Sequence, residues 1–396
     1  MPRIALVSNT DFSLYNFRLD LIKELVAKGH EVHVVCPDGE YAHKFTKMGV
    51  THHSFCVDRK GTNPFNEART LWQLYMIFRK SQFDVVHNFT VKINIYASLA
   101  ARLAGVPTII NSVTGLGYVF TENNLKARVL RKLVTVLYMV AFKFSRCVIF
   151  LNEDDFDVFK KNKIVDSHKG IVLRGEGVDT QRFCPEHVNQ DDLDKLRRQL
   201  GIQGDSRPVI VTIISRLLWH KGIREFVDMA RIVKATHSDV IFLLVGPIDT
   251  GNPAAVNEQF TRQAEDEGLI KYLGERKDIP EILYVSDIVT LPSFYREGIP
   301  MVLLEAMCME KPIVTTNSVG CKEVVEEGKN GFLVPTKDHV ALASAIEKLV
   351  NNEELRVKMG KYGREKALRE FDERIVVNRI LQIYEELLVN RSGERE

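Results

Sequence analysis

Apolar and polar positions along the chain follow a repeating order of strand, helix and strand. Arg3–Ser8 is a short apolar run, as expected for a strand buried on both faces of a parallel sheet. Arg18–Lys28 places apolar residues at helical spacing and is followed by Gly29, a residue that commonly ends helices. Glu31–Cys36 is a second apolar run. This succession predicts a βαβ unit, from which doubly wound α/β sheets are built.

The same alternation continues to the end of the chain in two series, with a helix predicted at Ile95–Ala104. The first series continues with strands at Phe83–His87, Thr108–Ser112, Cys147–Leu151 and Gly170–Leu173, and the second comprises Val209–Ser215, Ile241–Val245, Asp287–Leu291, Pro312–Thr315 and Phe332–Val334. Residues 184–207 between them are polar and charged, which places the domain junction near residue 188. The predicted fold class is α/β, with Rossmann-like domains at 1–188 and 189–375.

Length and charge refine this picture. A chain of 396 residues suits two domains of ordinary size, and 45% apolar with 27% charged residues is normal for a soluble protein. Residues 1–150 carry 19 Lys+Arg against 10 Asp+Glu (net +9), and the remainder carries 35 against 42 (net −7). A basic half attracts phosphates, an anionic membrane surface or nucleic acid, unless the excess merely lies on solvated faces.

Cysteine usage and the apolar segments indicate a compartment. The six cysteines form no C-x-x-C pair and no Cys/His spacing that fits zinc, as expected of reduced core residues. The N-terminal MPRIALVSNTDF lacks the regions of a signal peptide. The apolar stretch Leu133–Phe142 is too short to span a bilayer, which needs roughly 20 residues. We expect a cytoplasmic protein without a metal site.

The loop after the first strand, residues 9–16, contains no glycine. A G-x-G-x-x-G there would indicate NAD or FAD, and the chain also lacks the G-x-x-x-x-G-K-[ST] of a P-loop. A Rossmann-like fold without these fingerprints indicates another nucleotide ligand.

Two glutamates follow a strand of the second domain. Glu297 lies in the loop after Asp287–Leu291, and Glu305 lies about one turn into a helix predicted to begin near Pro300. Both carboxylates are thus expected at the carboxyl edge of a parallel sheet, where open α/β sheets bind ligands and a helix N-terminus suits phosphate. Alternatively, Glu297 caps the loop and Glu305 faces water, although a carboxylate in an apolar helix usually has a partner.

A basic pair follows the first strand of the second domain. Arg216 offers a bidentate fork and Lys221 a mobile point charge, a combination that suits the diphosphate of a nucleotide sugar. In a site without metal, such side chains and a helix dipole supply the neutralising charge. The alternative is a solvated basic loop.

Together, the R-x4-K and E-x7-E motifs resemble those of the family 4 retaining glycosyltransferases of the GT-B fold. The resemblance covers the whole chain and includes Gly175–Asp179 and Gly320–Val334. It implies two Rossmann-like domains facing across a cleft, with residues 376–396 packing back on the first. It also implies retention of anomeric configuration, UDP as the expected nucleotide, no metal dependence and no prosthetic group.

Matched position by position, the resemblance assigns the donor site. Arg216 and Lys221 hold the diphosphate, and Glu305 binds the ribose hydroxyls. Glu297 lies beside the donor sugar and is the first catalytic candidate. Three loop residues line the sugar and phosphate: Gly298, Ile299 and Pro300.

His87 is the second catalytic candidate. Many family members carry an H-x-H motif near this place whose histidine contacts the donor sugar, whereas Phe89 occupies the second position here. His87 can equally be a satisfied core histidine. In that case Lys92 and Thr90 become alternative phosphate contacts.

The first domain is expected to bind the acceptor. Two glycines after Thr108–Ser112 permit close backbone approach to a ligand, or simply form a tight turn. The acceptor candidates are Asn9, Asn16, Arg18, Lys92, Thr114, Gly115 and Gly117.

A basic and apolar segment indicates a membrane surface. Residues 124–151 contain no acidic side chain, and six basic residues interleave with apolar ones: Lys126, Arg128, Arg131, Lys132, Lys143 and Arg146. This composition is typical of an interfacial helix on an anionic leaflet, or of a buried helix with basic ends. The segment is similar to that of members that extend polyprenyl-diphosphate-linked sugars. We therefore expect a lipid-linked saccharide acceptor, a peripheral position on the inner face of the cell membrane, and no nucleic-acid partner.

Other functions stay open at this point. A UDP-N-acetylglucosamine 2-epimerase has the same fold and ligand but needs no acceptor, and a transferase could act on a soluble acceptor. The combined motifs favour a transferase that moves a hexose or N-acetylhexosamine during surface polysaccharide or glycan assembly. The diphosphate site argues against a carbohydrate-binding module without activity.

Overall fold

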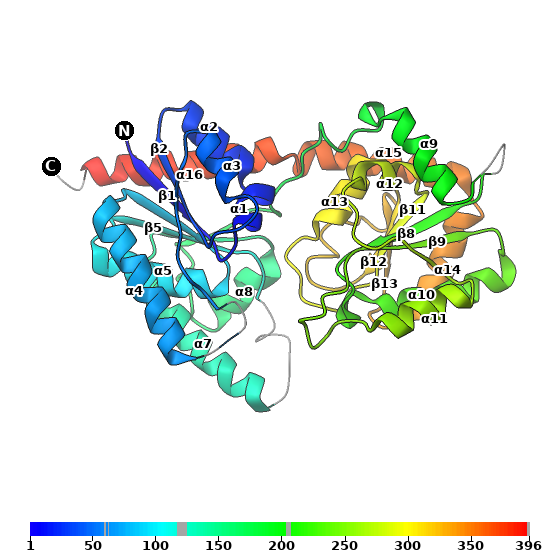
Figure 1. Cartoon of the computed structure of the whole chain (residues 1–396), viewed down its shortest axis with the longest axis horizontal. Coiled ribbons are helices and arrows are strands. Elements are labelled where there is room, and N and C mark those ends of the chain that lie inside the picture. The colour runs from blue at the N-terminus through cyan, green and yellow to red at the C-terminus, as the bar shows by residue number, and fades with distance from the viewer. Residues whose placement is uncertain (59–60, 62, 117–124, 203–206, 394–396) are drawn as a thin grey trace. The chain divides into compact units, whose positions relative to one another are not determined.

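The computed structural model describes residues 1–58, 61, 63–116, 125–202 and 207–393. Contacts divide the chain into two units: unit 1 comprises Met1–Glu176 and Arg374–Glu396, and unit 2 comprises Gly177–Glu373. Each unit contains one parallel sheet with helices on both faces (Figure 1). The α/β class and the two Rossmann-like domains are therefore confirmed.

The sheet of unit 1 has the strand order β3-β2-β1-β4-β5-β6-β7, and all its neighbours are parallel. The chain runs from β1 to β2 and β3, then returns to the other side of β1 as β4. This reversal marks the carboxyl ends of β1 and β4 as the place where such sheets bind ligands. The strands are β1 Arg3–Val7, β2 Glu31–Val35, β3 Thr51–His53, β4 Val85–Phe89, β5 Thr108–Val113, β6 Cys147–Phe150 and β7 Gly170–Val172.

Helices cover both faces of this sheet. Successive residues of β1 point to opposite faces, so Leu6 packs in one core cluster and Val7 in another. That is why the strand needs a near-continuous apolar run. The Leu6 face is covered by α2 (Leu19–Ala27) and α16 (Glu373–Gly393), and the opposite face by α4 (Pro64–Ser81), α5 (Val91–Ala104) and α7 (Leu125–Lys143).

The last helix, α16, belongs to the core of unit 1. Val377, Ile380 and Tyr384 are buried in the same cluster as β1, β2 and α2. Burying an apolar side chain of this size contributes about 1.5–3 kcal/mol. The chain therefore returns to complete the first sheet after building the second.

The sheet of unit 2 has the order β10-β9-β8-β11-β12-β13, and all its neighbours are parallel. Its reversal lies between β8 and β11, so the expected ligand edge is formed by the loops that follow these two strands. The strands are β8 Ile210–Ile214, β9 Ile241–Val245, β10 Lys271–Tyr272, β11 Ile288–Leu291, β12 Ile313–Thr316 and β13 Gly331–Val334. One face is covered by α10 (Ile223–Thr236) and α14 (His339–Val350), and the other by α9 (Gln190–Gln199), α12 (Ile279–Val285) and α13 (Met301–Cys308) (Figure 1).

The break between the units follows Glu176, earlier than the junction that composition predicts near residue 188. Val178 forms a bridge with Asp372, and Phe183 is buried in the unit 2 core. The polar residues that follow mark an exposed connection and helix. The apolar residues that precede this polar segment, Val178 and Phe183, already pack in the core of unit 2, so the unit begins before the change in composition.

The start of the first helix also differs from the prediction. The polar composition of residues 9–16 predicts a loop, whereas Asp11–Phe17 forms the helix α1. The Thr10 hydroxyl oxygen accepts a hydrogen bond from the Ser13 amide at 3.1 Å, and Asp11 is an acidic first-turn residue. Both are helix-start signals, but seven residues are too few for apolar periodicity to reveal the helix.

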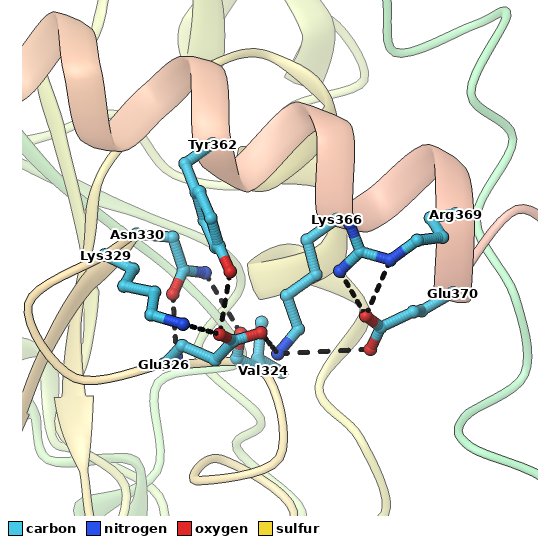
Figure 2. A network of polar contacts seen from close by, with 8 residues as sticks. All are labelled: Val324, Glu326, Lys329, Asn330, Tyr362, Lys366, Arg369 and Glu370. Atoms are coloured by element: carbon cyan, nitrogen blue, oxygen red, sulfur yellow. Dashed lines mark hydrogen bonds and ion pairs between the residues drawn. The ribbon is translucent and has the colours of Figure 1, made fainter.

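A polar network ties α15 (Glu353–Glu370) to the segment between β12 and β13 (Figure 2). Glu326 Oε1 accepts a hydrogen bond from Lys366 Nζ at 2.9 Å. Its Oε2 accepts from the Tyr362 hydroxyl at 2.8 Å and from Lys329 Nζ at 3.1 Å. These donors, Lys366 first, stabilise the charged form and lower the pKa of Glu326 to about 2. The carboxylate thus stays ionised at neutral pH and holds this segment against the helix.

Candidate active site

The loops after β8 and β11 bring the two predicted motifs of unit 2 together. Lys221 ends the short turn Trp219–Lys221 after β8, and Glu297 lies in the loop after β11. Lys221 Nζ is 2.6 Å from Glu297 Oε1, and the two side chains are 15% and 14% exposed. The Ser293 hydroxyl donates to the same oxygen at 3.0 Å. The basic motif and the first acid of E-x7-E therefore form one hydrogen-bonded ion pair.

Two glycines in the left-handed region allow these loops to approach. Gly222 has φ +83°, and a Cβ there would lie 2.2 Å from the carbonyl oxygen of Pro292. Gly320 has φ +84°, and a Cβ there would lie 1.6 Å from the carbonyl oxygen of Gly298. A larger residue at either position would push the loops apart. The geometry of the ion pair therefore depends on both glycines.

Arg216 lies nearer the start of the basic loop and is more exposed. Its side chain is 57% exposed, and Nη1 is 3.3 Å from Asp249 Oδ2. An exposed ion pair of this kind is weak, so a diphosphate can replace the carboxylate as the partner of the guanidinium. The sequence predicted the place of Arg216 on the ligand edge but not its partner Asp249.

Helix α13 begins after Pro300, as predicted, and the preceding Ile299 is buried. Glu305 lies in its second turn. The residue keeps some surface, but burial raises the pKa of its carboxyl group to about 7, against a smaller opposing effect of the Arg182 charge. Among the described residues, none forms a hydrogen bond with this carboxyl group. A desolvated acid without an internal partner suits a ligand that brings its own donors.

The basic motif also contains His220, to which the sequence assigns no role. Its ring packs on Tyr295, with centroids 4.5 Å apart. Burial, reinforced by the Lys221 charge, lowers the pKa of His220 to about 4, so the imidazole is neutral at pH 7. Its backbone carbonyl accepts a hydrogen bond from the Phe294 amide at 3.0 Å and is an alternative acceptor, at 3.1 Å, for the Ser293 hydroxyl. His220 therefore joins the two loops and adds no charge beside Lys221.

In unit 1, the contacts of His87 match the core interpretation and not the catalytic one. Its side chain is buried within β4, and both ring nitrogens are used. Nδ1 lies 2.6 Å from the Tyr384 hydroxyl, and Nε2 lies 2.8 Å from the Ser112 hydroxyl. Burial lowers the pKa of His87 well below its ordinary value. A neutral imidazole with both nitrogens engaged has no atom left for a donor sugar.

Two predicted acceptor contacts are also engaged inside unit 1. Arg18 Nη2 pairs with Glu176 Oε1 at 2.5 Å, and both side chains are largely buried. Lys92 Nζ lies 2.5 Å from Glu67 Oε1 and 2.6 Å from each of two backbone carbonyl oxygens. Both cations therefore stabilise the packing of unit 1 through these contacts, and their role toward an acceptor stays a prediction.

The remaining acceptor candidates lie at the carboxyl edge of the first sheet. Asn9 follows β1, and Asn16 is exposed on α1. Thr114 and Gly115 follow β5, and Gly115 has φ +144°. Gly117 lies outside the described residues.

The structure adds an aromatic cluster at this edge that sequence reasoning misses. Ring centroids are 5.8 Å apart for Phe12 and Tyr41, and 4.7 Å apart for Tyr15 and Tyr41. The buried Asp11 carboxylate accepts from the amides of Phe12 at 2.8 Å and Tyr41 at 2.6 Å. Lys44 Nζ lies over both tyrosine rings, and Phe12 is 50% exposed. The sequence signal is weak because the two halves of the cluster are 30 positions apart.

The described part of the chain offers neither a cluster of metal ligands nor a membrane-spanning helix. It contains no group of three His, Cys, Asp or Glu side chains that could hold a metal ion. Its helices include none that is both long and apolar enough to cross a bilayer. The six cysteines are free thiols.

The chain belongs to the glycosyl transferases group 1, a family of sugar-transferring enzymes. The model of that family matches residues 193–366, which contain both unit 2 motifs. A glycosyl transferase 4-like model matches residues 3–152. The resemblance inferred from the motifs is thereby confirmed, and the protein is a glycosyltransferase.

Two relatives align with most of the chain. The chain is 32% identical, over 388 residues, to the N,N'-diacetylbacillosaminyl-diphospho-undecaprenol alpha-1,3-N-acetylgalactosaminyltransferase of Campylobacter jejuni, covering 98% of this chain and 100% of that one. It is 30% identical, over 331 residues, to the UDP-Gal:alpha-D-GlcNAc-diphosphoundecaprenol alpha-1,3-galactosyltransferase of Escherichia coli, covering 82% and 81% of the two chains.

Solved structures show the same fold. A glycosyltransferase of Rickettsia africae superimposes with a TM-score of 0.79 at 21% identity, covering 98% of each chain. An Anabaena protein solved in complex with UDP gives a TM-score of 0.78 at 20% identity, covering 98% of this chain and 100% of that one.

The raised pKa of Glu305 predicts a stability effect with a defined pH window. The folded protein holds this proton up to about pH 7, whereas the unfolded chain releases it near 4.5, so wild-type stability falls as pH rises between these values. Glu305→Gln should therefore stabilise unit 2 by about 1–3 kcal/mol at pH 8 and by much less at pH 5. The measurement is urea unfolding in a Trp72→Phe background, where Trp219 is the sole tryptophan. A difference between the two proteins that is the same at both pH values would contradict this assignment.

Proposed function

We propose that the protein is a retaining glycosyltransferase that moves a hexose or N-acetylhexosamine from a UDP-sugar to a polyprenyl-diphosphate-linked saccharide. The observation that carries the proposal is the cation–acid arrangement at the β8–β11 edge of unit 2. The largely buried Lys221 is paired with Glu297, the first acid of E-x7-E. The second acid, Glu305, is desolvated and has no hydrogen-bond partner among the described residues. The printed names of the two relatives, both transferases acting on undecaprenol-diphosphate sugars, support the acceptor class.

Each side chain of the unit 2 site binds one part of the donor nucleotide sugar. The Lys221 and Arg216 cations bind the diphosphate, aided by the amides at the N-terminus of α13 beside Gly298, Ile299 and Pro300. The Glu305 carboxylate accepts hydrogen bonds from the ribose hydroxyls. UDP is the proposed nucleotide because the UDP-Gal of the Escherichia coli relative and the UDP bound to the Anabaena protein share it.

The ion pair suggests how the donor engages the site. Without donor, Lys221 is neutralised by Glu297. A diphosphate carries more charge than one carboxylate and draws the ammonium away, which leaves Glu297 to accept hydrogen bonds from the hydroxyls of the donor sugar. Donor binding thus exchanges one charged contact for two.

Transfer with retention then needs no protein nucleophile. The acceptor hydroxyl oxygen attacks the anomeric carbon on the side of the leaving group, the bond from that carbon to the diphosphate oxygen breaks, and the departing phosphate takes the acceptor proton. Lys221 and Arg216 stabilise the charge that develops on the diphosphate. We propose that this neutralisation makes the reaction independent of a metal ion.

We propose that the aromatic cluster of unit 1 binds the acceptor sugar. One face of a pyranose is lined with C–H groups and stacks on an exposed ring such as that of Phe12. Lys44 beside the cluster offers a cation to the acceptor diphosphate. Asn9 and Asn16 lie on the same edge and offer amide groups to sugar hydroxyls. Thr114, Gly115 and Gly117 stay proposed contacts of the loop after β5.

We also propose that α7 lies on the anionic inner face of the cell membrane, where a lipid-linked acceptor is held. Five apolar residues of the described part of this helix are exposed at helical spacing: Val129, Leu133, Val136, Met139 and Val140. Basic residues on the same exposed side are Arg128, Lys132 and Lys143. An exposed apolar stripe with flanking cations is the pattern of a helix that lies in the headgroup region.

A transfer assay tests the proposed reaction. The protein is incubated with UDP-galactose or UDP-N-acetylgalactosamine and a polyprenyl-diphosphate-linked saccharide, with and without a chelator. We expect UDP release and an acceptor heavier by one sugar, α-linked by NMR and formed equally with chelator. An epimerised UDP-sugar formed without acceptor would instead establish the epimerase, and equal transfer to the free saccharide would remove the lipid requirement.

Substitutions of the two residues of the ion pair should affect different quantities: Lys221 the affinity for UDP, and Glu297 the turnover number. Lys221→Ala should weaken UDP binding by about 1.5–3 kcal/mol, because one charged contact is lost. Glu297→Gln should leave UDP affinity unchanged or higher, because the lysine loses its competing partner, while kcat falls. Isothermal titration and initial rates measure both, with the exposed Arg262→Ala of unit 2 as a control for loss of one positive charge. Equal losses of UDP affinity in the two site variants would refute the division of roles.

Phe12 should act on the acceptor alone. Phe12→Leu keeps an apolar side chain but removes the ring, so we expect KM for the lipid-linked acceptor to rise about threefold to tenfold, in line with the energy of one aromatic contact. KM for the UDP-sugar should not change, and Phe12→Tyr should restore the acceptor KM. A rise in the donor KM, or the same loss with tyrosine, would contradict sugar stacking.

A further inference from the structure

Helix α4 exposes large apolar side chains along one stripe. Phe65 is 85% exposed, Trp72 is 62% exposed and Met76 is 49% exposed. Their spacing of seven and four positions places them on a single face of the helix. The opposite face, formed by Thr70, Leu74 and Phe78, is buried. The exposed stripe therefore contributes nothing to the core of unit 1, and exposed large apolar side chains gathered on one helix face indicate an interaction site.

The same exposed face is basic. Arg69, Arg79 and Lys80 are exposed on α4. The one carboxylate of the helix, Glu67, is half-buried and paired with Lys92 at 2.5 Å. The face that combines the aromatic stripe with these three cations therefore carries no acidic side chain.

Helix α4 is part of the same layer as α7. Helix α5 packs against both, and the three helices cover one face of the first sheet (Figure 1). Both outer helices of this layer therefore present an exposed apolar stripe with cations, and the two stripes differ in kind. That of α7 is aliphatic, whereas that of α4 contains an exposed tryptophan and an exposed phenylalanine.

We propose that α4 is a second membrane-docking element, which places Trp72 and Phe65 in the headgroup region of an anionic bilayer. Tryptophan is enriched at this depth because its ring is apolar and its N–H is polar, and Arg69, Arg79 and Lys80 bind the lipid phosphates. A second copy of the chain is a poorer occupant, because two such faces would bring like charges together. A nucleic acid would match the cations but leave the apolar stripe without a partner. The inference extends the membrane surface proposed for α7, but its test does not require transfer.

The chain contains two tryptophans, Trp72 in unit 1 and Trp219 in unit 2. In a Trp219→Phe variant, fluorescence therefore reports on α4 alone. With vesicles containing phosphatidylglycerol, we expect the emission to shift to shorter wavelength and brominated lipids to quench it. Phosphatidylcholine vesicles should give little effect, and high salt should reverse the effect with anionic vesicles.

A substitution pair measures the contribution to affinity. Phe65→Ser with Trp72→Ser should weaken binding to anionic vesicles about tenfold or more in a flotation assay. The matched control is Val340→Ser with Val357→Ser, two exposed apolar residues of unit 2. Binding should stay unchanged in the control, and both proteins should keep their affinity for UDP.

Three results would overturn the proposal. One is a protein that floats with vesicles while the Trp72 emission stays unchanged. A second is a shift that grows with protein concentration without lipid, which would assign the face to a second copy. The third is a shift with an oligonucleotide but not with vesicles. Vesicle binding through Trp72 without transfer to a lipid-linked acceptor would support this inference and refute only the proposed reaction.

Discussion

The ion pair between Lys221 and Glu297 is the interaction around which the unit 2 site is organised. It joins the loops that follow two neighbouring parallel strands, where the strand order reverses, and two left-handed glycines permit the approach. His220 beside it is kept neutral by burial, so it adds no charge to that of the ion pair. The pair keeps the ammonium at this edge of the sheet, from which, in the proposed reaction, the diphosphate of the donor draws it away.

Glu305 shows how such a site differs from an ordinary core. A carboxyl group that is desolvated and has no internal hydrogen-bond partner lowers stability whenever it is ionised. Proteins retain unfavourable groups of this kind mainly where a ligand compensates for them. The acid that weakens the fold of unit 2 is therefore the one best suited to bind the hydroxyls of a nucleotide.

The strands of both sheets could be predicted from the sequence, because a strand covered on both faces must be a nearly continuous apolar run. In a parallel sheet, the loops that follow the strands all lie at the carboxyl edge. Arg216 and Glu297, which follow β8 and β11, could therefore be assigned to one edge from the sequence alone. The sequence could not decide between the two roles of His87, because its partner Tyr384 lies 297 positions away. Residue type alone does not reveal whether a polar group is already satisfied by a distant segment. The exposed stripe of α4 could not be predicted for a related reason. Apolar residues lie on both faces of this helix, and the sequence does not show which face is buried in the core.

The most direct test is a crystal structure with UDP bound. We expect the diphosphate oxygens within hydrogen-bond distance of Lys221 Nζ and the Arg216 guanidinium, the ribose hydroxyls donating to the Glu305 carboxylate, and the lysine separated from Glu297. Nucleotide bound elsewhere, with the ion pair intact and Glu305 untouched, would contradict the account.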